Sequence, residues 1–318
     1  MSDDTGKTAE KTPDASNDSD GLDTSIDARG SARIAARSRV TGISAGIRSL
    51  GLMDKDVLDA YNMNHGTRGH ALIFNHENFH WSVGMNRRAG TQIDADNLND
   101  RFRELGFTTH VHQDVSTVRV REIIFEAARA DHSNYDAFIC VFLSHGDDGI
   151  IYAHDGVLRL QDLMNQFRGD VCPSLAGKPK IFFIQACRGD QHEIGVDAPD
   201  EPDSGPMPDE RMTVADAGTQ PTIPAGADFL VAYSVTQGYF SHRDTHYGSW
   251  FVQALSYILA TYGNELEICE MLSMVNRMVS QRQVERAVDQ EMIGKKQVPC
   301  FLSMLTKKLY FPRKVHHT

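Results

Sequence analysis

The stretch KIFFIQACRGD, residues 180–190, decides how the rest of this chain is interpreted. Its apolar run 181–184 follows the turn residues 177–179, and a short apolar run bounded by turn residues predicts a strand that is buried on both faces. In an open parallel sheet, chemistry takes place beyond the carboxyl ends of the strands, where Cys187 would lie. The polar, small and cationic neighbours of Cys187 favour a reactive thiolate over a buried, inert cysteine.

Composition narrows the function classes. The chain has 32 Lys and Arg against 43 Asp and Glu, a net charge of −11, and an acidic chain without a basic stripe is poorly suited to nucleic acid. No apolar run is long enough to span a bilayer. The five cysteines are unclustered, which argues against disulfides or a zinc site and favours a reducing, cytoplasmic setting. We therefore expect no nucleic-acid or membrane partner, no metal and no cofactor.

Strand and helix patterns alternate along the middle of the chain. Apolar runs predict strands, and apolar residues at helical spacing predict helices. The predicted strands are 71–74, 107–111, 137–143, 181–184, 228–234 and 300–305, and the predicted helices are 94–106, 116–130, 158–167, 248–262 and 266–279. This alternation indicates an α/β fold, a parallel sheet with helices on both faces.

Two segments lack the apolar residues of a core. Residues 1–39 are rich in Ser, Asp, Thr, Lys and Gly, and we expect them to be disordered. Residues 191–226 contain acids, prolines and glycines, and so long a stretch without a core predicts an exposed linker. A single α/β domain interrupted by a linker fits the pattern better than two domains.

A cysteine protease needs a thiolate, a proton donor for the leaving amine and an oxyanion site. His145 ends the predicted strand 137–143 as Cys187 ends the strand 181–184, so the two side chains meet if these strands are neighbours. Gly146 allows a substrate carbonyl to approach closely, and we assign the oxyanion site to the backbone N–H groups of Gly146 and Cys187. Asp147 and Asp148 are candidates to orient His145 by adjacency alone, and we expect neither to do so.

Several motifs resemble those of the caspases, and most closely the executioner type with a short prodomain. They are QACRG at 185–189, SHG at 144–146, GSWF at 248–251 and PCFLSMLTKKLY at 299–310. The resemblance runs from about residue 70 to residue 311. It implies a caspase-like three-layer sandwich, mainly parallel, whose large and small subunit segments are joined by a cleavable linker. The expected parts are a disordered prodomain 1–39, a large segment 40–203, a linker remainder 204–226 and a small segment 227–318.

The resemblance also implies a function: a cysteine endopeptidase that cuts after Asp, executes apoptosis and is made as a zymogen. The residue before the cut, P1, would then be an aspartate. The implied substrate-binding positions are Arg88, Gln185, Arg243, Ser241, His242 and Trp250. Two planar guanidinium groups suit a carboxylate. His242 stands where the family usually has Trp, which predicts weaker selection for an aliphatic P2 residue.

Activation and assembly follow from the same resemblance. The implied cleavage sites are Asp203 and Asp216 in the linker and Asp23 and Asp27 in the prodomain. The active form is expected to be a homodimer of processed units joined through the strand 300–305. The expected partners are protein substrates with Asp at P1, an upstream initiator caspase and inhibitor-of-apoptosis proteins.

Two other classes of protein are alternatives to an active protease. A catalytically inactive homologue, acting as decoy or scaffold, would be separated from an enzyme by turnover of an Asp-containing peptide. A nucleotide-binding α/β protein is disfavoured, because no GxGxxG follows a predicted strand.

Overall fold

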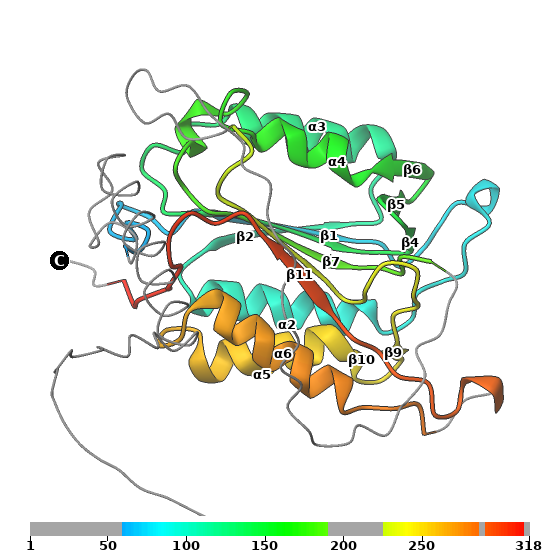
Figure 1. The fold of residues 1–318 in the computed structure, drawn as a ribbon. Helices are drawn as coiled ribbons and strands as arrows, with labels where there is room; N and C mark the ends of the chain where they lie inside the picture. The colour runs from blue at the N-terminus through cyan, green and yellow to red at the C-terminus, as the bar shows by residue number, and fades with distance from the viewer. Residues whose placement is uncertain (1–58, 190–224, 286–289, 315–318) are drawn as a thin grey trace, which may run out of the picture. The chain divides into compact units, whose positions relative to one another are not determined.

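A six-stranded sheet lies at the centre of the structure, a computed structural model that describes residues 59–189, 225–285 and 290–314 (Figure 1). The strand order is β11-β8-β7-β3-β1-β2. The strands are β1 (His70–Asn75), β2 (Thr108–Gln113), β3 (Phe138–Leu143), β7 (Lys180–Gln185), β8 (Phe229–Tyr233) and β11 (Cys300–Ser303). Neighbours are parallel except β11, which pairs antiparallel with β8. The predicted, mainly parallel sheet is confirmed.

Some predictions fall outside these described ranges. They concern the prodomain 1–39, most of the linker, and the four cleavage sites Asp23, Asp27, Asp203 and Asp216.

The register of the two central strands places the chemistry at one sheet edge. β3 pairs with β7 so that Leu143 stands opposite Gln185, the last residue of each strand. The Ser144 N–H donates to the Gln185 carbonyl at 3.1 Å. The residues that follow, including His145 and Cys187, therefore leave the sheet side by side.

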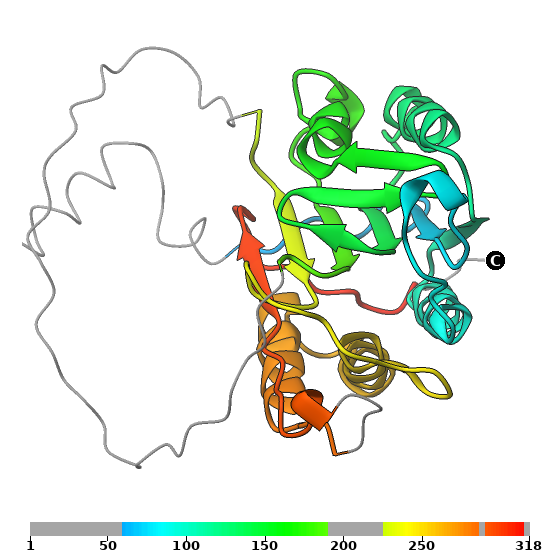
Figure 2. The same ribbon diagram turned by 90° about the vertical axis from the view of Figure 1, so that its right-hand side faces the viewer.

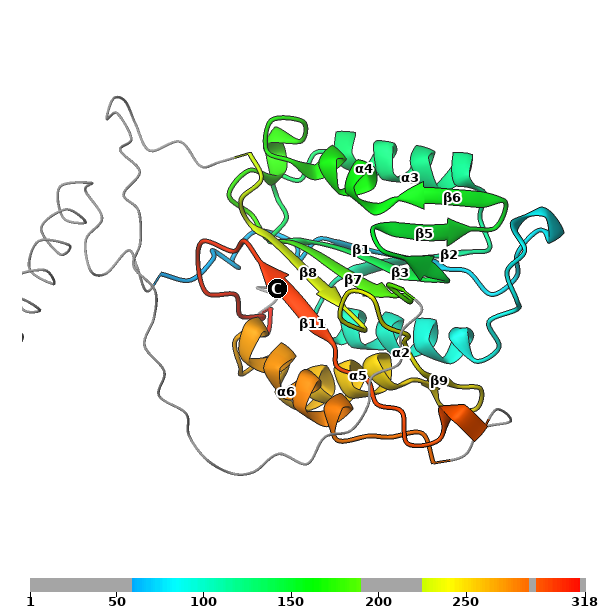
Figure 3. The same ribbon diagram turned by 45° about the vertical axis from the view of Figure 1, so that its right-hand side comes forward.

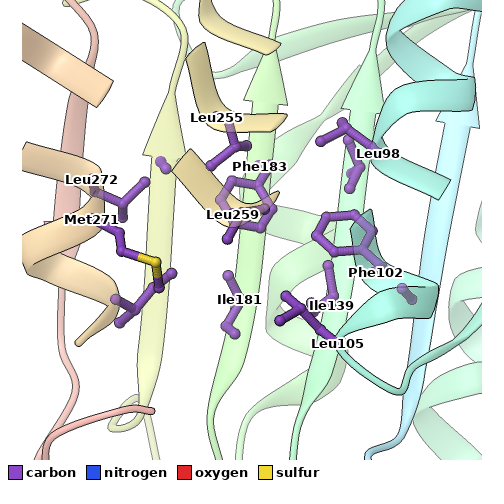
Figure 4. Close-up of a cluster of buried hydrophobic side chains, with 14 of the residues drawn as sticks. Leu98, Phe102, Leu105, Ile139, Ile181, Phe183, Leu255, Leu259, Met271 and Leu272 are labelled. Atoms are coloured by element: carbon purple, nitrogen blue, oxygen red, sulfur yellow. The ribbon is translucent and has the colours of Figure 1, made fainter. Parts of the chain in front are cut away.

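Helices cover both faces of the sheet (Figure 1). On one face lie α3 (Thr117–Arg129) and α4 (Leu160–Met164), and on the other lie α2 (Thr91–Glu104), α5 (Trp250–Tyr262) and α6 (Ile268–Ser280). Alternate residues of each central strand enter the two apolar clusters, which is why these strands are apolar throughout. Figure 4 shows one cluster, in which side chains of α2, α5 and α6 gather over Ile181 and Phe183.

Local sequence explains where the helices start. Gly90 precedes α2 in the left-handed region (φ 86°), and Asp94 in the first turn with Arg101 and Arg103 in the last complement the helix dipole. This helix begins at Thr91 rather than at the predicted residue 94. The Ser116 side chain caps α3 by accepting from the Arg119 N–H at 3.2 Å.

The structure also contains a three-stranded sheet that the sequence analysis did not predict (Figure 3). It consists of β4 (Gly146–Asp147), β5 (Ile150–Ala153) and β6 (Gly156–Arg159), all antiparallel. The predicted helix 158–167 is wrong at its start, because residues 158 and 159 belong to β6. The α-helix is α4 alone, and a 3-10 turn (Asn165–Phe167) follows it.

The remaining short elements lie around this framework. They are the 3-10 helices η2 (Trp81–Val83), η4 (Pro173–Leu175) and η5 (Gln290–Met292), and the paired strands β9 (Arg243–Asp244) and β10 (Gly248–Ser249). Figure 2 shows β11, in red, beside β8, in yellow, at the sheet edge. Leu302 of this edge strand is 57% exposed. Among the described residues, no helix is both long and apolar enough to cross a membrane.

Candidate active site

The two candidate catalytic side chains, those of His145 and Cys187, line the same cavity. The cavity has a volume of about 420 Å³ and lies where β3 and β7 end. Its lining residues are Met85, His145, Gly146, Asp147, Tyr152, Cys187, Gly189 and Phe240. Tyr152 comes from β5, so the small sheet forms one wall. Cys187 is half-buried and contributes to the lining of the cavity.

A main-chain carbonyl orients His145. Its Nε2 lies 2.8 Å from the Asn86 oxygen, and because a carbonyl can only accept, Nε2 carries the proton. The other ring nitrogen, Nδ1, then has a free lone pair. Asp148 instead pairs with Arg188 at 3.3 Å and accepts from Gln237. No side-chain signal could have predicted the role of Asn86, since any residue supplies a carbonyl.

Burial lowers the pKa of His145 below its ordinary value, and the nearby charges of Arg88 and Arg243 lower it further. The hydrogen bond with the Asn86 carbonyl acts in the opposite direction. The imidazole is therefore neutral at neutral pH, a state from which it can take up or deliver a proton.

The backbone beside Cys187 has no room for a side chain at position 146. A Cβ on Gly146 would lie 2.7 Å from the Ile150 oxygen, 2.8 Å from the Ala186 Cβ and 3.0 Å from the Cys187 oxygen. Two of these neighbours are backbone atoms that cannot move aside cheaply. Glycine is therefore required for the backbone at 146 to lie against the loop that carries the thiol.

Arg88 is a buried cation, with 1% of its surface exposed. Its Nη1 donates to the His76 carbonyl at 2.9 Å and to the Thr91 Oγ1 at 2.8 Å. Its Nη2 is buried and has no hydrogen-bond partner among the described residues. Burial lowers the pKa of Arg88 to about 9, and the charge of Arg243 contributes. A buried guanidinium with a spare donor suits an incoming anion.

Arg243 and Gln185 complete the predicted set. Arg243 Nε donates to the Ala89 carbonyl at 3.0 Å, and Gln185 Nε2 donates to the Ser241 Oγ at 2.7 Å. The Gln185 Oε1 is buried without a partner among the described residues. Arg88 lies two residues after Asn86, whose carbonyl holds His145, and Arg243 lies two residues after Ser241, which Gln185 holds two residues before Cys187. Both arginines are thereby tied to the segments that carry His145 and Cys187.

A larger cavity of about 940 Å³ adjoins Arg243 and contains the remaining predicted positions. His242 and Trp250 line it with their ring centroids 4.9 Å apart. The guanidinium of Arg282 lies 4.9 Å from the centroid of the Trp250 ring, a contact the sequence analysis missed. The cavity thus combines an aromatic wall with cationic groups.

A thiol and an imidazole at the edge of a mainly parallel sheet, beside two half-buried or buried arginines, define a cysteine protease of α/β fold. Residues 68–310 match the family model described as Caspase domain. The chain belongs to the caspase family and is a cysteine-type endopeptidase with a protease role in apoptosis. Family membership also implies protein substrates and dimerisation.

Several known relatives support this assignment. The chain is 51% identical over 251 residues to Caspase-6 of Gallus gallus, covering 79% of this chain and 83% of that protein. It is 44% identical over 253 residues to Caspase-3 of Felis catus, covering 80% and 87%. The crystal structure of Caspase-1 from Spodoptera frugiperda matches with a TM-score of 0.73 at 39% identity, over 80% of this chain and 96% of that one. The executioner-type resemblance is confirmed.

Proposed function

We propose that this protease cuts peptide bonds after aspartate. The observation that carries the proposal is the pair of guanidinium groups beside Cys187, one of them fully buried with a spare donor. An aspartate at P1 would place its carboxylate between Arg88 and Arg243, with Gln185 beside them. A neutral P1 side chain would leave buried cations unpaired, at a cost of about 3–5 kcal/mol.

The catalytic roles follow from the geometry of the cavity. The Cys187 thiolate attacks the carbonyl carbon of the P1 residue, and the backbone N–H groups of Gly146 and Cys187 donate to the resulting oxyanion. His145 Nδ1 first takes the proton of the Cys187 thiol, which leaves the attacking thiolate, and delivers that proton to the leaving amine. It then takes a proton from the water that hydrolyses the thioester and returns it to the sulfur. The Asn86 carbonyl keeps the imidazole in the tautomer that this exchange needs. Ser241, His242 and Trp250 contact the residues that precede P1.

We further propose that the chain is a zymogen. Its segments are a prodomain 1–39, a large segment 40–203, a linker remainder 204–226 and a small segment 227–318. The linker is acidic and offers Asp203 before Ser-Gly and Asp216 before Ala, each an aspartate followed by a small residue. Asp23 and Asp27 are the candidates for removal of the prodomain. Intact-mass analysis of active protein should show a fragment that ends at Asp203 or Asp216, and replacing both by Ala should block activation.

The proposed setting is the cytoplasm, with an upstream initiator caspase as activator and inhibitor-of-apoptosis proteins as regulators. The exposed Leu302 on the edge strand β11 supports a homodimer joined through that strand, because an unpaired apolar edge is prone to pairing. Sedimentation of the active form should give the mass of a dimer of processed units. A monomeric active form would contradict this assembly.

The deciding experiment is a P1 scan with peptides that differ only at that residue. We expect cleavage after Asp and little after Asn, Glu or Ala, and no cleavage by Cys187→Ala with its fold retained. Turnover by Cys187→Ala would remove the nucleophile assignment. A wild-type protein that binds such peptides without cutting them would favour the inactive homologue, against which the joint presence of His145 and Cys187 in one cavity weighs.

A further inference from the structure

Asp94 is a buried acid that the proposed mechanism leaves unused. It lies in the first turn of α2 with none of its surface exposed. Its Oδ1 accepts from the Ser249 N–H at 2.8 Å, and its Oδ2 is buried without a hydrogen-bond partner among the described residues. A Cβ on Gly248 (φ 86°) would lie 2.3 Å from Oδ1, so only glycine lets β10 approach the carboxylate this closely. A buried carboxylate with one oxygen unsatisfied needs an explanation.

The geometry connects this carboxylate with both arginines of the proposed P1 pocket. Arg88 binds the Oγ1 of Thr91, which lies one turn before Asp94 on the same helix. Arg243 stands directly opposite Ser249 in the β9–β10 pair, and Ser249 holds Asp94. Asp94 therefore links two elements. One is the β9–β10 pair, which carries Arg243, and the other is helix α2, which carries Thr91, the partner of Arg88.

The charges of Asp94, Arg88 and Arg243 depend on one another. Asp94 favours the charged forms of Arg88 and Arg243, and each of them favours the ionised form of Asp94. In the free protein, two cations and one anion leave one net positive charge. A P1 carboxylate would neutralise that charge and would compete with Asp94 for the same two guanidinium groups.

We propose that Asp94 is a positioning residue that compensates Arg88 and Arg243 in the free enzyme and takes up a proton from solvent when a P1 carboxylate enters. The step is balanced, because the carboxylate of Asp94 and one proton give the neutral acid while the substrate carboxylate replaces its charge. This inference rests on the proposed aspartate specificity. It adds to the same pocket a carboxyl group, that of Asp94, whose charge depends on whether substrate is bound. The substrate class that drives the proton uptake is a peptide with an acidic P1 residue.

The pKa of Asp94 in the free enzyme suits this role. Burial raises its pKa to about 6, while the hydrogen bond from the Ser249 N–H and the charges of the arginines act to lower it. A second anion beside the arginines cancels part of their lowering effect, so the pKa of Asp94 rises when the ligand binds. Other ionisable groups act on the same arginines and must be separated by experiment: Glu77, His76, His145 and Cys187.

Calorimetry can count the proton. A reversible peptide aldehyde with Asp at P1 is titrated into the active protein at about pH 6.5 in buffers of different ionisation enthalpy. Wild type should take up about half a proton more per ligand than Asp94→Asn, as expected when an added negative charge raises a pKa near 6 by about one unit. The asparagine keeps an oxygen for the Ser249 N–H. A purely structural role for Asp94 would leave the two proton counts equal.

Asp96→Asn is the matched control, because Asp96 is an exposed acid two residues further along the same helix. It should behave as wild type, and loss of the uptake in this variant as well would overturn the inference. If Asp94→Asn does not fold, the wild type titrated with an otherwise identical Asn aldehyde decides. We expect that ligand to lack the extra uptake, and equal uptake with both aldehydes would overturn the inference.

The outcomes separate the two proposals. Tighter binding of the Asp aldehyde than of the Asn aldehyde, without extra proton uptake, overturns the role of Asp94 and leaves the proposed specificity intact. Equal affinity for the two aldehydes overturns the proposed specificity, and the role of Asp94 falls with it.

Discussion

Replacing Arg88 by alanine should remove most of the preference for aspartate at P1. Arg88 is almost fully buried, and its Nη1 is already held by the His76 carbonyl and the Thr91 hydroxyl. Its Nη2 has no partner among the described residues and is available to a ligand. The substitution therefore deletes a pre-positioned charged donor rather than a flexible surface group.

The expected magnitude follows from the chemistry of that donor. Losing a charge-assisted hydrogen bond and leaving its carboxylate partner undercompensated costs about 3–4 kcal/mol, which is about a 10²- to 10³-fold loss in kcat/KM. The loss should be confined to acidic P1 residues, because an Asn substrate does not need the guanidinium. The assay is kcat/KM on a pair of peptides with Asp or Asn at P1, with a thermal melt to verify folding.

The neighbouring arginine provides the matched control. Arg87 has a side chain that is 70% exposed and pairs with Glu77 at 2.6 Å, and such a surface ion pair contributes at most about 1 kcal/mol. Arg87→Ala should thus lower kcat/KM by less than about fivefold. Equal losses in the two variants, or an unchanged ratio of Asp to Asn cleavage in Arg88→Ala, would refute the assignment of the pocket.

Three further changes test other parts of the molecule. Gly146→Ala should lower kcat by about 10²- to 10³-fold, because the new Cβ displaces an oxyanion donor, and a fully active variant would exclude that role. Burial lowers the pKa of Lys180 to about 8 from 10.5, so the folded form loses its proton first. Lys180 should therefore contribute a rise in stability of about 3 kcal/mol as pH increases from about 8 to 10.5, and the difference in unfolding free energy between wild type and Lys180→Met in denaturant titrations should show that rise. His242→Trp should sharpen selection for aliphatic P2 residues, and an identical P2 scan would contradict this.

The central strands could be predicted because a strand buried on both faces has a continuous run of apolar residues. β3 and β7 are apolar at nearly every position, and the predicted ranges match theirs within about one residue. The sheet β4-β5-β6 could not be predicted in the same way. Its strands have two to four residues and are joined by tight turns, which is too short for a periodic pattern to develop.

The residues of the site likewise include some that could be predicted from the sequence and some that could not. His145 and Cys187 follow recognisable strands, and the sheet register brings them into one cavity. Asn86 was missed because it acts through its carbonyl, which carries no sequence signal. Asp94 was missed because an acid in the first turn of a helix is typical of a solvated surface, and only the packing of β10 on α2 shows that it is buried.

β7 and β8 flank the linker along the chain, yet they pair in the interior of the sheet, with Ile184 opposite Tyr233. A cut between residues 190 and 224 would therefore leave the sheet pairing in place while separating the peptide that carries Cys187 from the peptide that carries Arg243. Folding of a single chain would become an association of two, so the melting temperature of the cut protein would depend on its concentration. Sufficient dilution would dissociate the halves of the active site, a route to inactivation that the uncut chain does not have.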